Sequence, residues 1–206
     1  MTAHLQTSVL DALLAADADG GGSPGPALRP LDGVERTVLT HGAWVDVLPG
    51  WVTGSDELFL HLVERVPWRE ERRRMYERVV EVPRLLSWFG EHDPLPDPLL
   101  TQAMPFRTAG LCYYRDGRDS VAWHGDTIGR SSTEDTMVAI VSFGAPRRLA
   151  LRPRDGVGGT LSFALGHGDL IVMGGSCQRT WEHAVPKTAQ VVGPRISVQF
   201  RPRGVR

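Results

Sequence analysis

The second half of the chain is a succession of short apolar segments separated by turn residues, and this pattern constrains the fold more than any other feature. From Phe106 onward, Gly, Pro, Asp and Arg occupy the connections and no long helical pattern intervenes. Strands at such short spacing favour an antiparallel sandwich or jelly roll over a parallel sheet of βαβ units. The predicted strands are Leu111–Tyr114, Ser120–Trp123, Met137–Phe143, Arg148–Leu151, Thr160–Phe163, Asp169–Met173 and Arg195–Arg201.

The region before these strands is predicted to add a few elements to an all-β core. Val38-Leu39 and Ala43–Leu48 are strand-like. A helix is predicted from Ser55 to about Val66, because Ser55-Asp56 can cap its start and its apolar residues Leu58, Phe59, Leu62 and Val66 lie on one face. The run from Arg69 to Arg84 mixes charges of both signs. Such a run favours a solvated face over a nucleic-acid-binding one.

Composition limits the class of protein. The 206 residues are 41% hydrophobic and 23% charged, which is typical of one globular domain with or without a tail. No apolar run approaches the roughly 20 residues of a membrane helix, so no membrane association is predicted. Cys112 and Cys177 make no disulfide framework, and this favours a reducing, cytoplasmic location.

Charge is distributed unevenly along the chain. The net charge is −1, but acidic residues dominate 1–103 and basic residues dominate 104–206. A basic second half can face an anion such as a phosphate or a carboxylate. The asymmetry is equally consistent with a simple drift in composition, so it carries little weight alone.

The strongest local motif is Trp123-His124-Gly125-Asp126. Residues i and i+2 of a strand point to the same face, so His124 and Asp126 can converge on one ion. A second histidine would complete the two-His, one-carboxylate set of non-haem iron oxygenases. His183, just past a predicted strand, is a better candidate than His167, which lies in a predicted turn. The pair alone is weak, because many histidines serve only packing or lie at the surface.

The last predicted strand places four polar side chains on one face, namely Arg195, Ser197, Gln199 and Arg201. Two arginines that point into a barrel are costly unless an anion meets them. A dicarboxylate can supply that anion, because arginine binds a carboxylate through two hydrogen bonds. From alternation alone, a solvated face is an equally good interpretation.

The region from about Pro83 to Arg203 resembles the AlkB family of Fe(II)- and 2-oxoglutarate-dependent dioxygenases in the order and spacing of its motifs. The matching pieces are Pro83-Arg84-Leu85, Trp88-Phe89-Gly90, Tyr113-Tyr114-Arg115-Asp116-Gly117, Asp119 to Asp126, Ser142-Phe143-Gly144-Ala145, Gly168 to Met173, His183 to Lys187 and Arg195 to Arg201.

This resemblance implies a mainly β fold with flanking helices around a double-stranded β-helix (jelly roll) core. Composition predicts residues 1–33 as an N-terminal segment with a Gly- and Pro-rich linker, which leaves 34–206 as the dioxygenase domain. Within that domain, 34–105 would form a substrate-recognition extension and 106–206 the β-helix core.

The resemblance also implies the ligands and cosubstrates of the site. Fe2+ would be held by His124, Asp126 and His183, with 2-oxoglutarate and O2 as cosubstrates. Arg195 would bind the distal carboxylate of 2-oxoglutarate with help from Tyr114, and Arg201 would lie near its iron-chelating end. The reaction would convert 2-oxoglutarate to succinate and CO2 while a C–H bond is hydroxylated, so that an N-methyl group leaves as formaldehyde.

Three positions depart from the family pattern. Cys112 and Ser197 stand where many members have asparagine, both near the cosubstrate. Thr127-Ile128 follows the metal-binding Asp126, where nucleic-acid repair members have acidic residues that contact the damaged base. The first two changes affect hydrogen bonding to 2-oxoglutarate at most, whereas the third concerns the substrate.

The substrate implied by the resemblance is alkylated nucleic acid, acted on by a monomer in DNA alkylation repair. A base must be flipped out or single-stranded to be reached, and aromatic residues can stack on it. Alternatives are the same chemistry on a protein side chain or small molecule, a cupin-like metal-dependent isomerase, and a silent binding module. The residues implied for substrate binding are Arg84, Trp88, Phe89, Tyr113 and Trp123.

Overall fold

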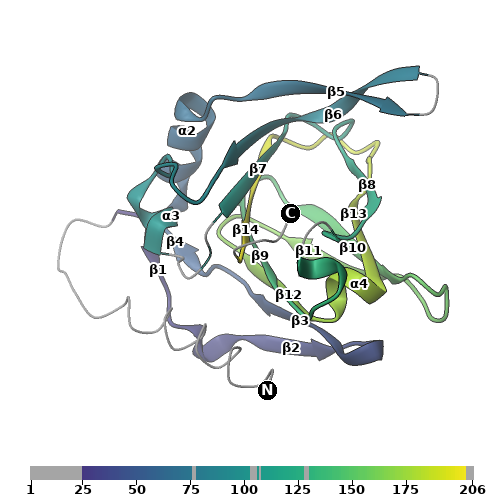
Figure 1. Cartoon of the computed structure of the whole chain (residues 1–206). Helices are drawn as coiled ribbons and strands as arrows, with labels where there is room; N and C mark the ends of the chain where they lie inside the picture. Colours follow the sequence, from purple (N-terminus) through teal and green to yellow (C-terminus); the bar gives the residue numbers. More distant parts are fainter. Residues whose placement is uncertain (1–24, 76–77, 103–105, 107, 128–129, 203–206) are drawn as a thin grey trace.

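Two antiparallel sheets stacked face to face make up most of the molecule, as the computed structural model shows (Figure 1). It describes residues 25–75, 78–102, 106, 108–127 and 130–202. The larger sheet has eight strands, in the spatial order β2 (Glu35–Val38), β3 (Ala43–Leu48), β12 (Leu170–Gly175), β9 (Val138–Gly144), β14 (Arg195–Arg201), β7 (Thr108–Tyr114), β6 (Arg78–Phe89) and β5 (Arg69–Met75). The smaller sheet has four, in the order β11 (Leu161–Leu165), β10 (Arg147–Pro153), β13 (Trp181–Val185) and β8 (Val121–His124).

Few helices flank this jelly roll. They are α2 (Ser55–Arg65), α3 (Pro98–Gln102) and α4 (Cys177–Thr180), together with the 3-10 turns η1 (Leu31–Gly33), η2 (Thr40–Gly42) and η3 (Arg130–Ser132). A short pair of strands, β1 (Ala27–Leu28) and β4 (Val52–Thr53), forms a separate ribbon. The predicted mainly β jelly roll with flanking helices is therefore confirmed.

The larger sheet separates two hydrophobic cores. Its inner face, which we define as the face toward the smaller sheet, packs side chains such as Ile140 and Met173 against Leu149 and Leu151 of β10. Its outer face is covered by α2, which lies to one side of the barrel in Figure 1. Because a strand presents alternate residues to opposite faces, β14 can contribute apolar side chains to the outer core and polar ones to the inner space.

Helix α2 forms where the sequence predicted a helix. Its buried residues Leu58 and Leu62 are four apart, so they lie on one face and pack into the outer core. The residue before its first turn is Gly54, which adopts a left-handed conformation with φ of 60°. Residues Asp56 and Glu57 in the first turn face the positive end of the helix dipole.

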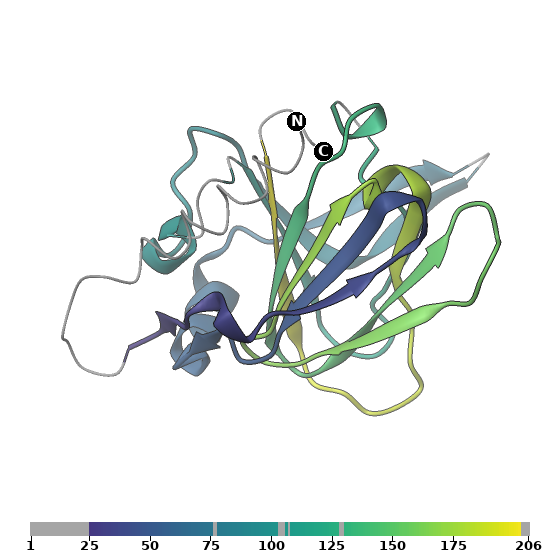
Figure 2. The same ribbon diagram turned by 90° about the horizontal axis from the view of Figure 1, so that it is seen from below.

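Every strand predicted after Phe106 is present, but five further strands were not predicted, namely β1, β4, β5, β6 and β13. The charged run from Arg69 to Arg84 is a long antiparallel hairpin of β5 and β6 that extends the larger sheet at one edge, at the top of Figure 1. Strand β13 was also missed. Figure 2 shows the opposite edge of the same sheet, where β2 and β3 lie beside β12.

The expected substrate-recognition extension (34–105) and the expected β-helix core (106–206) both contribute strands to the larger sheet. Strand β6 pairs with β7, and β3 pairs with β12, so strands from 34–105 form both edges of the larger sheet and strands from 106–206 form its middle. The expected N-terminal segment, residues 1–33, falls mostly outside the described residues. In the part of the chain that the structure describes, no helix is long and apolar enough to cross a membrane.

Candidate metal centre

His124, Asp126 and His183 meet between the two sheets. One ligand atom from each lies within 4.8 Å of the others, and this is the one group of three or more potential ligand residues found among the described residues. His124 on β8 and His183 on β13 are directly opposite each other in the smaller sheet, with ring centroids 4.2 Å apart. Two imidazoles and one carboxylate fit Fe(II) and leave other coordination positions open.

A β-bulge places His124 on the inner face. Val121 pairs with Val185 and His124 pairs with His183, so Ala122 and Trp123 together lie opposite the single residue Ala184. In a regular strand, residues 121 and 124 would point to opposite faces; the extra residue restores a common face. The His124 Nδ1 atom lies 2.8 Å from the Ala122 carbonyl, which fixes Nδ1 as the donor and leaves Nε2 for a metal.

Asp126 is held at three of its groups. Its Oδ2 accepts a hydrogen bond from Arg201 Nε at 2.8 Å and forms an ion pair with Arg201 Nη2, also at 2.8 Å. Its backbone carbonyl accepts a hydrogen bond from the Ser131 hydroxyl, and its backbone N–H donates to Gln178 Oε1 at 3.0 Å. Oδ1 is left facing His124 Nε2, 3.9 Å away. One carboxylate oxygen is therefore held by arginine while the other points toward the metal position.

The charge state of the ligands suits a cation. Burial raises the pKa of Asp126, but Arg201 and the two histidines outweigh it, so the net pKa is lowered and the carboxylate stays ionised. Burial, with the His124 charge next in size, lowers the pKa of His183 to about 3. A neutral imidazole and an ionised carboxylate are the forms that bind a metal.

Arg195 is a buried cation with spare donors. Its side chain is 2% exposed, and its Nη2 donates to Ser142 Oγ at 2.8 Å. Its Nε and Nη1 have no hydrogen-bond partner among the described residues, although both are buried. A buried guanidinium with unsatisfied N–H donors is suited to an anion, and arginine is a preferred partner of carboxylates. The residues present therefore fit the distal carboxylate of 2-oxoglutarate.

Tyr114 and Ser197 surround Arg195 on the inner face. The Tyr114 ring lies 5.2 Å from the Arg195 guanidinium carbon, and the two residues pair across β7 and β14. Burial raises the pKa of Tyr114 to about 12, so its hydroxyl remains a hydrogen-bond donor at neutral pH. Ser197 is 2% exposed and its Oγ accepts from Gln199 Nε2 at 3.2 Å.

The polar face of β14 is continuous from Arg195 to the metal centre. Gln199 Nε2 also approaches Cys112 Sγ at 3.2 Å, and Gln199 Oε1 accepts from Arg201 Nη2 at 3.0 Å. Arg195, Ser197 and Arg201 are buried, so the interpretation of this face as solvated is wrong. Cys112 and Ser197, which replace the asparagines of many family members, both belong to this network.

Of the residues expected to bind substrate, Trp88 lies beside the metal centre. Its ring is 44% exposed and lies 5.7 Å from the guanidinium carbon of Arg201, which in turn contacts Asp126. A β-carbon at Gly110 would lie 3.3 Å from the Trp88 ring, so glycine allows the indole to lie flat against β7. An exposed aromatic ring next to the metal ligands can stack on a planar substrate.

Phe89, Tyr113 and Trp123 are not brought to the site. Phe89 and Tyr113 pack against the outer core, and the Tyr113 ring centroid lies 5.2 Å from that of Trp68. Trp123 lies beneath Arg152, whose guanidinium carbon is 4.3 Å from its ring. Each directly follows or precedes a residue on the inner face, and neighbours on a strand point to opposite faces. That alternation is visible in the sequence, and it would have excluded these three residues from the predicted substrate contacts.

Two further arginines have structural contacts. Arg84 donates from Nη1 to the Ser120 carbonyl at 3.1 Å, and its buried Nε lacks a partner among the described residues. Arg147 is 5% exposed and donates to the carbonyls of Asp116, Asp119 and Pro186. Arg147 therefore holds loops together. Arg148, Arg152 and Arg154 are at the surface.

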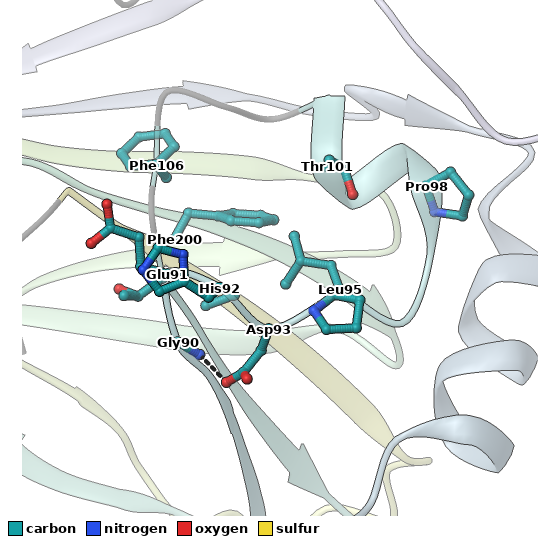
Figure 3. A pocket seen from close by; sticks show the side chains of 12 residues that line it. Gly90, Glu91, His92, Asp93, Leu95, Pro98, Thr101, Phe106 and Phe200 are labelled. Atoms are coloured by element: carbon teal, nitrogen blue, oxygen red, sulfur yellow. Dashed lines mark hydrogen bonds between the residues drawn. The ribbon is translucent and has the colours of Figure 1, made fainter.

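A cavity of about 670 Å3 lies elsewhere, beside the outer face of the larger sheet. Figure 3 shows Leu95, Pro98 and Phe106 around Phe200, with Glu91 and His92 at its rim. Phe200 points away from the inner face to which its neighbour Arg201 belongs. This hollow contains none of the metal-ligand cluster, so the functional site is assigned to the space between the sheets.

Sequence analysis missed Gln178, which contacts Asp126 directly. It lies in the four-residue helix α4, which is too short to leave a periodic pattern in the sequence. Ile128, part of the Thr127-Ile128 departure, lies outside the described residues, whereas Thr127 directly follows Asp126 in a turn closed by its N–H and the Gly125 carbonyl at 2.9 Å.

Comparison with known families and proteins agrees with this geometry. Residues 52–201 match the 2OG-Fe(II) oxygenase superfamily. The chain is 31% identical, over 88% of its length and 76% of the relative, to the alpha-ketoglutarate-dependent dioxygenase alkB homolog 3 of Bos taurus. It is 32% identical to the DNA oxidative demethylase ALKBH2 of Arabidopsis thaliana, over 58% of this chain and 46% of that protein.

The fold has a counterpart among solved structures. A crystal structure of an oxidoreductase of the 2OG-Fe(II) oxygenase family from Burkholderia pseudomallei matches with a TM-score of 0.52. The match covers 78% of this chain and 86% of the other at 14% identity, so it supports the jelly-roll fold alone.

Proposed function

The chain belongs to the 2OG-Fe(II) oxygenase superfamily and, within it, to the AlkB family; from this premise we propose that it removes alkyl groups from N-alkylated bases of DNA or RNA by oxidative demethylation. The observation that carries the proposal is the cluster of His124, Asp126 and His183, which lies between the same two sheets as the buried Arg195 guanidinium with its unpaired Nε and Nη1. The cupin-like isomerase is disfavoured, because it has no need of that buried arginine.

Each residue has a definite task in this proposal. His124, Asp126 and His183 hold Fe(II), and Arg201 fixes the carboxylate of Asp126 from behind. Arg195 binds the distal carboxylate of 2-oxoglutarate, with Tyr114 and Ser197 lining that end. When bound, Fe(II), 2-oxoglutarate and O2 supply the oxidation, which yields succinate and CO2 and inserts oxygen into a C–H bond of the alkyl group. The protein contributes orientation and exclusion of water.

The substrate is proposed to enter beside Trp88. A base inside a duplex cannot reach an enclosed metal centre, so the enzyme must take a single strand or a flipped-out base. Trp88 offers a half-exposed ring for stacking next to Arg201 and the metal ligands. Thr127 contributes a neutral hydroxyl where family members that repair nucleic acid have an acidic residue, which keeps open a protein side chain or a small molecule as the substrate.

The test is an aerobic reaction with Fe(II), 2-oxoglutarate and ascorbate. Single-stranded DNA and RNA carrying 1-methyladenine or 3-methylcytosine serve as substrates, and succinate and repaired bases are quantified by mass spectrometry. His124→Ala removes a proposed ligand, and His61→Ala, an exposed histidine on α2, is the matched control. We expect one succinate per repaired base in the wild type and in His61→Ala, and neither product in His124→Ala.

Other outcomes have definite meanings. Succinate without base repair would retain the dioxygenase and move its substrate to a protein or a small molecule. No succinate from protein that binds iron would contradict the proposed reaction. The proposal also includes a monomer located in the cytoplasm. The two cysteines, which are buried and unpaired, support this location, because a reducing compartment keeps thiols reduced. Sedimentation of the purified full chain tests the monomer.

A further inference from the structure

Gln178 is buried beside the metal centre and has no role in the reaction described so far. It is 1% exposed and lies in α4, the short helix between β12 and β13. Its Oε1 accepts the backbone N–H of Asp126 at 3.0 Å, although the two residues are 52 positions apart in sequence. Its Nε2 is also buried and has no partner among the described residues. The amide is therefore committed to the metal-binding loop.

Asp126 needs this support because its own backbone is outside regular structure. Strand β8 ends at His124, so the Asp126 N–H does not continue the sheet ladder. Asp126 is instead the central residue of a tight turn, closed by the hydrogen bond from Thr127 N–H to the Gly125 carbonyl. A buried N–H without an acceptor is costly, and only an oxygen from another element can satisfy it here.

The contact between α4 and the metal-binding loop is close. A β-carbon at Gly125 would lie 2.5 Å from the Gln178 carbonyl oxygen and 3.2 Å from the Trp181 carbonyl oxygen. Glycine between the two ligands therefore lets the backbone of α4 lie directly against the loop. Helix α4 therefore contacts the loop twice, through the Gln178 side chain at Asp126 and through its backbone at Gly125. Together these contacts restrict the position of Asp126.

Helix α4 is in turn anchored to the larger sheet. The Ser176 hydroxyl donates to the His41 carbonyl at 2.6 Å, and Trp181 Nε1 donates to the Thr40 carbonyl at 3.3 Å. Both acceptors belong to η2, the turn between β2 and β3. His183 follows two residues after Trp181, so one short helix sets the position of two metal ligands. Figure 1 shows α4 at the lower end of the barrel.

We propose that Gln178 is a positioning residue for the metal centre, which holds the Asp126 backbone so that Oδ1 points at the iron. The inference rests on the proposed ligand set. An amide suits the role because it offers an acceptor oxygen without adding a negative charge beside a carboxylate that already belongs to the site. Arg201 holds the carboxylate from one side and Gln178 holds the backbone from the other, so neither can replace the other.

The test is metal affinity, measured on the purified full chain with Mn(II) in place of Fe(II). Binding is followed by isothermal titration and by the electron paramagnetic resonance spectrum of bound Mn(II). Gln178→Met keeps the length of the side chain and removes the acceptor, whereas Gln178→Glu keeps an acceptor oxygen at the same reach. The same two substitutions at exposed Gln190 are the matched controls.

We expect Gln178→Met to weaken Mn(II) binding roughly 10- to 100-fold, as loss of a group that orients a ligand does, and to broaden the Mn(II) spectrum. Gln178→Glu should recover most of the affinity, and both Gln190 variants should bind like the wild type. Wild-type affinity and spectrum in folded Gln178→Met would overturn the inference, even if that variant melts at a lower temperature.

Two further outcomes keep this proposal separate from the proposed reaction. If Gln178→Met does not fold, Gln178→Asn, whose shorter amide cannot reach Asp126, replaces it with the same expected loss. A wild type that binds Mn(II) but repairs no base would contradict the proposed substrate and leave the role of Gln178 to be decided by the titration. A wild type that binds no Mn(II) would overturn both the ligand set and this inference.

Discussion

Arg195 and Arg147 are both buried arginines of the inner space, but their guanidinium groups are satisfied to different degrees. Arg147 donates to three backbone carbonyls, whereas Arg195 keeps two buried N–H groups without an acceptor among the described residues. An unsatisfied buried cation costs folding free energy. Arg147 therefore serves stability, whereas the unpaired groups of Arg195 carry a cost to stability that the proposed binding of a carboxylate would offset.

Substitution of each arginine by methionine separates these roles. Arg195→Met should raise the unfolding free energy of the ligand-free protein by about 1–3 kcal/mol, since a buried unpaired charge is removed. It should weaken 2-oxoglutarate binding roughly 30-fold or more, because a desolvated charge pair is lost. Arg147→Met should instead lower the unfolding free energy by about 2–4 kcal/mol, since three carbonyls lose their donors.

Urea unfolding and titration calorimetry with 2-oxoglutarate and Mn(II) measure these quantities. If Arg195→Met destabilised the free protein as much as Arg147→Met and left cosubstrate binding unchanged, Arg195 would be a structural residue.

At the scale of single residues, the sequence predicted the chemistry better than it predicted the substrate contacts. The candidate ligands His124, Asp126 and His183 were named from the family resemblance, and the structure brings the three together. The polar residues of β14 were named from strand alternation. Tyr113 and Trp123 were expected at the site although they adjoin Tyr114 and His124, and a strand sends neighbours to opposite faces. Gln178 could not be found, since its contact with Asp126 depends on how α4 packs against a distant loop.

At the scale of elements, strands with alternating apolar residues were predicted from the sequence, whereas strands without this alternation were missed. The strand β5 is made of Arg69–Met75, almost entirely charged, so no pattern of period two marks it. It forms because its partner β6 carries the apolar residues and extends the sheet from β7. The bulge in β8 was also hidden, because one additional residue in a strand has no signature in composition.

Helix α2 was predicted because its apolar residues recur at helical spacing, and its burial gives a quantitative expectation. Leu62 is 0% exposed within the outer core, whereas Leu60 on the same helix is 59% exposed. Leu62→Ala should lower the unfolding free energy by about 2–5 kcal/mol through lost burial and a residual cavity. Leu60→Ala should change it by no more than about 0.5 kcal/mol.

Urea denaturation of both variants checks this expectation, with the slope of the transition as a control for two-state behaviour. Equal costs for the two leucines would show that α2 does not pack on the sheet through the Leu58–Leu62 face.

At the scale of the whole molecule, the candidate site unites the two sheets. The metal ligands come from β8, β13 and the loop that follows β8, whereas Arg195 and Arg201 come from β14 of the larger sheet. The ion pair of Arg201 with Asp126 is the contact that joins them at the centre. The jelly roll therefore places the candidate metal ligands at one sheet and the two arginines on the other, facing the same space.

Ion pairs across this molecule also set its behaviour in acid. Arg118, through its guanidinium and its backbone N–H, lowers the pKa of Asp116 to about 2. Burial raises the pKa of Asp119. Hydrogen bonds from the side chain and backbone of Arg115 lower this pKa by more than burial raises it, so the net shift is downward. The net pKa of Asp126 is lowered as well. A carboxyl whose pKa is lower in the folded state binds its proton more readily when unfolded.

The sign of the pH dependence follows directly. Stability from these carboxylates is present above about pH 4, the unfolded pKa, and is lost as the pH falls through the lowered pKa of each group in the folded state. Asp119→Asn removes one such group without removing its volume. The difference in unfolding free energy between wild type and Asp119→Asn should be on the order of 1 kcal/mol at pH 6 and should shrink as the pH falls below about 4. Urea unfolding at several pH values measures it, with exposed Glu57→Gln as the control that changes less. A difference that stayed constant from pH 6 to pH 2 would mean that Asp119 supports the loop by hydrogen bonding that is independent of its charge.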